Sequence, residues 1–178
     1  DLEVVIDNCI LRQADDIFDN VFRNFDDENN FSHSIKDRQH NIVIRGVGNA
    51  VIDGGKHNGL TEFNSSKMNI PMRKNNMILL YNLSHFTISN ITFKDPRWWT
   101  INIIHASDGL LSDLKIKAYS SVPNQDGIDL RVGCHDIILK NLSGHAGDDF
   151  IALSAIGSKL NEKSFNYIFR IDEEDDDI

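Results

Sequence analysis

The sequence contains only two cysteines, Cys9 and Cys134, among 178 residues. Two cysteines cannot form the several disulfides that stabilise a small disulfide-rich domain. Both lie in apolar, strand-like surroundings, where a buried free thiol is the commoner state. We therefore predict that both are buried and unpaired.

Long hydrophobic runs and clusters of basic residues are also absent. No apolar run approaches the roughly 18 residues of a membrane-spanning helix, and the sequence itself leaves the cellular compartment open. The 18 lysines and arginines form no cluster, and 27 acidic residues give a formal net charge of -9. Neither a nucleic acid nor a membrane is therefore expected as a partner, because neutralising phosphates requires clustered positive charge. The oligomeric state stays open.

The chain is long enough to bury one core of ordinary size, since 40% of its residues are hydrophobic. We predict a single domain over residues 1–178, with polar, irregular loop insertions at 11–38 and 56–76. Residues 172–178 form an acidic end that is expected to be solvated. A strand-like stretch at 165–171 and a broken repeat predict that the chain is a segment of a longer protein.

Two sets of short apolar strands share one period. The first set aligns on one apolar position in each strand: Leu79, Ile101, Ile128 and Ile151. The spacings between these positions are 22, 27 and 23 residues. Strands of the second set end in polar turn residues spaced by 23 and 28 residues: Asn90, Asp113 and Asn141.

This repeat predicts an all-β fold, a right-handed parallel β-helix. Its coils cannot bury their apolar faces alone and must stack on one another. A leucine-rich repeat has a similar period, but its Leu-x-x-Leu-x-Leu pattern is absent here. A parallel sheet with crossover helices is also disfavoured, because no segment between the strands shows a helical apolar period.

Two acidic turns precede neighbouring strands of this repeat. Asp126 precedes the strand of Ile128, while Asp148 and Asp149 precede the strand of Ile151. If the two isoleucines are equivalent, Asp126 and Asp149 are stacked about 4.8 Å apart on adjacent coils, with Asp148 to one side. Such turns often serve only as turn formers. Stacked like charges raise at least one pKa, however, and we therefore predict that these three carboxylates form a catalytic site.

The two turns resemble motifs of glycoside hydrolase family 28, the polygalacturonases and their relatives. Asn124-Gln125-Asp126-Gly127 is similar to the family's Asn-Thr-Asp-Gly, and Gly147-Asp148-Asp149 to its Gly-Asp-Asp. The resemblance covers about residues 40 to 155 and implies a parallel β-helix that cleaves glycosidic bonds with inversion. It also implies that Asp148 is the general acid, and that Asp126 and Asp149 orient and deprotonate the attacking water.

Further residues near these turns are predicted to bind substrate. Asn124 and Gln125 flank Asp126 within its motif. Trp98 and Trp99 are consecutive, so on a strand one would face the core and the other would offer a sugar ring an apolar platform. Arg97 could bind an anionic sugar or be a solvated surface residue.

Other functions remain open at this stage. The Gly-His-Gly and Arg-Ile-Lys motifs of the family are missing, which leaves room for a non-catalytic glycan-binding or structural β-helix. Stacked carboxylates also attract Ca²⁺, as in lyases of similar fold, but no full oxygen cage is visible in the sequence. We predict an oligosaccharide or polysaccharide substrate of pectin or polygalacturonate type, no cofactor and no metal.

Overall fold

The computed structural model describes residues 1–15, 17–25, 35–55, 75–118 and 124–154. Within them the chain forms thirteen strands and one short 3-10 helix: β1 (Leu2–Asp7), β2 (Ile10–Arg12), β3 (Phe22–Arg23), η1 (Ile35–Asp37), β4 (Gln39–Val47), β5 (Val51–Asp53), β6 (Ile78–Ser89), β7 (Thr92–Lys94), β8 (Ile101–Ser112), β9 (Lys115–Lys117), β10 (Ile128–Arg131), β11 (His135–Lys140), β12 (Ser143–His145) and β13 (Ile151–Ser154). None of the helices in this part of the chain is long and apolar enough to cross a membrane.

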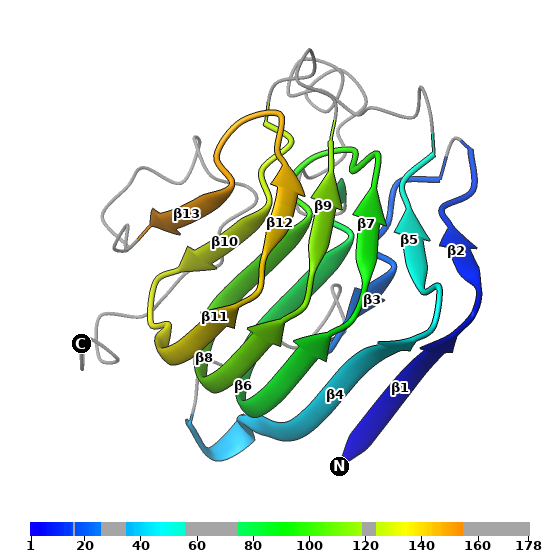
Figure 1. Cartoon of the computed structure of the whole chain (residues 1–178). Coiled ribbons are helices and arrows are strands. Elements are labelled where there is room, and N and C mark those ends of the chain that lie inside the picture. Colours follow the sequence, from blue (N-terminus) through cyan, green and yellow to red (C-terminus); the bar gives the residue numbers. More distant parts are fainter. Residues whose placement is uncertain (16, 26–34, 56–74, 119–123, 155–178) are drawn as a thin grey trace.

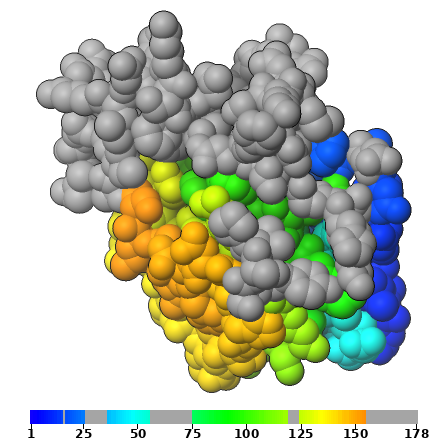
Figure 2. All heavy atoms as spheres, turned by 90° about the horizontal axis from the view of Figure 1, so that it is seen from above, coloured from blue at the N-terminus to red at the C-terminus, as the bar shows by residue number. Residues whose placement is uncertain are grey.

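All strand pairs within the described residues are parallel, and successive coils stack in sequence order. One sheet has the order β1-β4-β6-β8-β10-β13, with β3 and β11 at its sides, and the other has the order β12-β9-β7-β5-β2. Figure 1 shows these strands side by side, and Figure 2 shows the coils following one another across the molecule. The predicted right-handed parallel β-helix is confirmed.

Each coil has three faces. The first face contains β3, residues 78–81 of β6, residues 101–104 of β8, β10 and β13. The second face contains β1, β4, β11 and the later halves of β6 and β8. The third face is the smaller sheet that runs from β2 to β12.

The core consists of apolar side chains stacked from coil to coil, one row for each face. On the first face, Ile78, Ile101 and Ile128 are partners in register, and each is 0% exposed. A second row pairs Ile88 with Leu111, and a third pairs Phe93 with Ile116. The middle coils therefore bury their apolar side chains against the coils on either side, whereas Ile151 and Leu153 on the last described strand are exposed.

The register confirms part of the predicted alignment and corrects one position. Ile101, Ile128 and Ile151 are equivalent, as predicted, but the residue that pairs with Ile101 is Ile78, not Leu79. The spacing of the first two coils is therefore 23 residues rather than 22. Residues 77–81 are all buried, so their sequence has no apolar alternation from which the register could be read.

The chain turns at residues with a left-handed backbone. Among the described residues, all twelve non-glycine residues with positive φ are Asn, Asp or His, the side chains that adopt this conformation most readily. They form columns, because Asn90, Asp113 and Asn141 occupy the same corner of successive coils. Asn141 Nδ2 donates to Asp113 Oδ1 at 2.9 Å, which links two coils at that corner.

The predicted insertions are only partly described. Within residues 11–38 the chain contributes the end of β2, the two-residue strand β3 and η1. Residues 56–74 of the second predicted loop, and the acidic end at 172–178, lie outside the described residues.

Both cysteines are free, but Cys9 is exposed in the bend after β1, so its predicted burial is wrong. Cys134 is half-buried and its thiol donates to the Ile103 carbonyl at 3.3 Å.

Gly109 lies opposite Phe86 on the neighbouring strand, and a methyl group at Gly109 would meet the ring at 2.3 Å. We expect Gly109→Ala to lower the free energy of unfolding by about 1–3 kcal/mol, as overpacking does, measured by urea denaturation. In a Phe86→Leu background the added loss should be smaller, because the smaller side chain relieves the clash. Equal losses in both backgrounds would contradict this explanation.

Candidate active site

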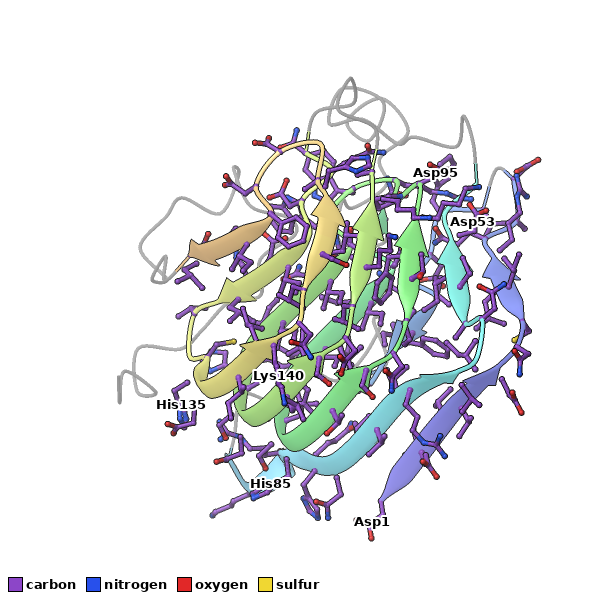
Figure 3. The ribbon with its side chains drawn as sticks, in the orientation of Figure 1. Asp1, Asp53, His85, Asp95, His135 and Lys140 are labelled. Atoms are coloured by element: carbon purple, nitrogen blue, oxygen red, sulfur yellow. The ribbon has the colours of Figure 1, made fainter. Side chains whose placement is uncertain are left out.

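The acidic turns lie at the corner where each coil passes from the third face to the first. Asp53 is the last residue of β5, and Asp95 directly follows β7, so both lie at this side of the molecule (Figure 3). Figure 3 shows three other labelled residues at the opposite side: His85, His135 and Lys140. Lys94 Nζ contacts Asp53 at 3.0 Å and Asp95 at 3.3 Å. This corner therefore gathers acidic groups from several coils.

The register places Asp126 beside Asp149. Ile128 pairs with Ile151, so the residues two positions earlier occupy equivalent places on adjacent coils. The Gly127 amide donates to the Asp149 carbonyl at 2.9 Å, which shows that the parallel register continues into the turn. Asp148 is correspondingly beside Gln125, one residue aside. We call Asp126, Asp148 and Asp149 the acidic corner.

The three carboxylates differ in their surroundings. Asp126 is 7% exposed, whereas Asp148 and Asp149 are exposed. The backbone of Asp126 is held firmly, because the amide and the hydroxyl of Thr100 both donate to its carbonyl, at 2.8 and 2.7 Å. Oδ1 of its side chain has no hydrogen-bond partner within the described part of the chain.

Burial, together with the negative charges of Asp148 and Asp149, raises the pKa of Asp126 to about 7. The positive charge of Arg131 opposes this rise in pKa. A carboxyl group that changes its protonation state near neutral pH can accept or donate a proton during a reaction. The acidic corner therefore combines one buried, proton-exchanging group with two exposed carboxylates.

Asp129 is a neighbouring buried acid that the sequence analysis did not include in the site. It lies on β10 and is 1% exposed. Burial, together with the charge of Asp126, raises its pKa to about 8, and Arg131 opposes this rise. The sequence signal was its alternation with Ile128 and Leu130, but alternation predicts only that Asp129 faces away from the core. It does not predict that the outer surface is covered.

The two tryptophans lie in the connection between β7 and β8 rather than on a strand. Trp98 is buried and Trp99 is half-buried, so they differ in exposure as predicted, although not through strand alternation. Trp99 precedes Ile101 by two residues and is therefore beside Asp126 in the register. The Arg131 guanidinium lies 4.8 Å from the centre of the Trp99 ring and stacks over it.

Arg97 and Gln125 are bound to the backbone of other coils. Arg97 is 2% exposed, and its guanidinium donates to the carbonyls of Gly54 and Ala14, each at 2.7 Å, and to that of Ile17. The Gln125 side-chain amide donates to the Pro96 carbonyl, and Gln125 is 3% exposed. Both contacts connect coils, whereas the predicted role of these residues in substrate binding stays a prediction.

Asn124 begins the turn before Asp126 with a φ of 58°, and it is half-buried. Asparagine suits this position because its side chain tolerates the left-handed backbone conformation.

Across residues 1–154, excluding the segments that the structure leaves undescribed, no three His, Cys, Asp or Glu side chains are placed to hold a metal ion.

Comparisons with known proteins match this chain to glycosyl hydrolases. The sequence model described as glycosyl hydrolases family 28 matches residues 17–167. A curated protein of Aspergillus niger, named "Putative galacturan 1,4-alpha-galacturonidase C", is 28% identical over 121 residues. That match covers 64% of this chain and 28% of the Aspergillus protein, so the chain spans less than a third of that relative's length.

A solved structure from Parabacteroides merdae, titled as a "putative glycosyl hydrolase", was also matched. It is 13% identical, with a TM-score of 0.31, and the match covers 66% of this chain and 57% of the other.

Replacing Asp126 by Asn should stabilise the protein at neutral pH but not in acid. The folded-state pKa is raised from 3.8 to about 7, so the proton on Asp126 stabilises the fold fully below pH 3.8 and is lost as the pH rises through 7. As the pH rises between these limits, the free energy of unfolding of the wild type should fall by up to about 4 kcal/mol, whereas that of Asp126→Asn should not. Urea denaturation at pH 4, 6 and 8 measures this difference. Asp113→Asn, at an exposed corner, serves as the control, and a pH-independent difference for Asp126→Asn would refute the assignment.

Arg97→Lys should destabilise the fold by about 2–4 kcal/mol, because one ammonium group cannot replace a buried guanidinium that donates to three backbone carbonyls. Arg45→Lys is the matched control. Arg45 pairs with Glu3 at the surface, and its replacement should cost less than about 1 kcal/mol in urea denaturation. If Arg97→Lys left stability unchanged but weakened binding of an anionic sugar, Arg97 would instead be a ligand-binding residue.

Proposed function

The chain belongs to family 28 of the glycosyl hydrolases, and from this membership and its acidic corner we propose that the protein hydrolyses glycosidic bonds of a pectin-type polysaccharide with inversion. A galacturonate polymer is the proposed substrate, supported by the name of the Aspergillus relative, which refers to galacturan. The observation that carries the proposal is the register between Ile128 and Ile151, because it brings carboxylates of two coils together.

In the proposed reaction, Asp148 donates a proton to the leaving-group oxygen. Asp126 and Asp149 hold the attacking water and remove its proton. Inverting enzymes keep their acid and base about 6.5–9.5 Å apart to leave room for that water. Asp148 and Asp126 are diagonal neighbours on adjacent coils, which is compatible with such a separation.

The protonation of Asp126 would set the pH dependence of this reaction. Asp126 must be ionised to accept a proton, and its pKa is raised to about 7 by burial and by the two neighbouring carboxylates. The increase of kcat/KM with pH on the acid side would then report Asp126. Trp99, beside Asp126 in the register, would support the sugar ring next to the bond that is cleaved.

Asp148→Asn, made in the full-length protein, should lower kcat by about 10²- to 10⁴-fold, the usual contribution of a general acid. Product release from polygalacturonate and from neutral glycans measures the rate. Asp113→Asn, an exposed corner aspartate outside the site, should leave the rate unchanged. Wild-type protein that binds these glycans without cleaving them would refute hydrolysis and favour a glycan-binding β-helix. Unchanged turnover in Asp148→Asn would refute its role as the acid.

A further inference from the structure

The outer surface of β8 and β10 contains two buried acceptor atoms without partners. Asn102 and Asp129 are partners in register on these strands, and each is 1% exposed. Asn102 Oδ1 and Asp129 Oδ2 receive no hydrogen bond from any residue in the described ranges. An ionised Asp129 would leave both oxygens desolvated without a donor, which is costly in a protein interior.

Asn102 contacts a second buried asparagine, Asn76, whose own Nδ2 has no partner among the described residues. Asn102 Nδ2 donates to Asn76 Oδ1 at 3.0 Å, and Asn76 is 0% exposed. In this orientation Asn102 Oδ1 is an acceptor without a partner, while the second N–H of the amide remains available as a donor. Side chains of register partners on parallel strands point to the same side of the sheet, so Asp129 is a neighbour of this amide.

The charged groups around Asp129 also favour its neutral form. Asp126, Asp148 and Asp149 face it from its own turn and from the next coil, while Arg131 is the opposing positive charge. Burial is the largest cause of the rise in its pKa. Arg131 itself stacks on Trp99 and is 7% exposed, so its charge is shared between several neighbours rather than paired with Asp129 alone.

We propose that the Asp129 carboxyl stays protonated after Asp126 has ionised, and that its Oδ2–H donates a hydrogen bond to Asn102 Oδ1. One proton then satisfies both buried oxygens. Asp129 is thereby a positioning residue, since it fixes the outer surface of β10 and spares Asp126 a further nearby negative charge. The meaning for catalysis rests on the proposed function, in which Asp126 is the base, whereas the protonation of Asp129 does not depend on it.

Infrared spectroscopy tests the proposal on the full chain, because a protonated carboxyl has a carbonyl band distinct from that of a carboxylate. Between pH 7 and 8, the range between the two raised pKa values, the wild type should show this band, and Asp129→Asn should show only the weaker band of the Asp126 fraction that is still protonated. Asp108→Asn, an exposed control, should keep it. Absence of the band in the wild type would overturn the proposal. That result is expected if the Asn102 amide is reversed and donates to an ionised Asp129.

The order of ionisation provides a second readout. If Asp129 is still neutral when Asp126 ionises, Asp129→Asn leaves the titration of Asp126 unchanged. Asp126→Asn, in contrast, lowers the pH at which the Asp129 band disappears, because it removes a nearby negative charge. A shift of the Asp126 titration to lower pH in Asp129→Asn would show that Asp129 ionises first and would overturn the proposal.

If Asp129→Asn fails to fold, Asn102→Ala replaces it. Removing the acceptor should move the position of the Asp129 band, and an unmoved band would contradict the Asp129–Asn102 bond. The pH dependence of kcat/KM adds a readout for the catalytic consequence: its acid limb should lie at the same pH in the wild type and in Asp129→Asn. Lack of hydrolysis by the wild type would refute the proposed function, while the infrared result would still decide the state of Asp129.

Discussion

The geometry of the site depends on the in-register stacking of buried aliphatic side chains along the first face. Ile78, Ile101 and Ile128 are buried in one row, which the exposed Ile151 continues in register, and the backbone bonds of the parallel ladder lock that row. A shift by one residue would turn the buried side chains outward and separate the acids of neighbouring turns. The apolar row therefore fixes the position of the polar groups in the neighbouring turns, and the free energy of core burial is what holds like charges together.

The sequence predicted the features that depend on the repeat period. The predictions failed where the burial of a residue depends on contacts with segments distant in sequence. The period predicted the β-helix, the pairing of Ile128 with Ile151 and the turn column of Asn90. Leu79 was misaligned because every residue around it is buried, so no pattern distinguishes neighbouring registers. Arg97 is interior because backbone carbonyls from a distant segment surround its guanidinium, and no local pattern contains that information.

Burial also gives chemically identical carboxyl groups different properties. Asp126 and Asp129 lie three residues apart, on a turn and the strand that follows it, and both are buried. Asp148 and Asp149 belong to an equivalent turn on the next coil and are exposed. Composition alone counts four similar acids, whereas burial raises the pKa of Asp126 to about 7 and that of Asp129 to about 8.

The left-handed corners have a consequence for how such a chain can vary during evolution. Asn, Asp, His and Gly can replace one another in the corner columns, but a β-branched residue cannot adopt that backbone without strain. The length of the connections between strands is not limited in this way. The step from Ile101 to Ile128 is four residues longer than the 23 residues that separate Ile128 from Ile151. Substrate preference can therefore diverge through the lengths of these connections. The few residue types that tolerate the left-handed corners meanwhile preserve the winding of the coil.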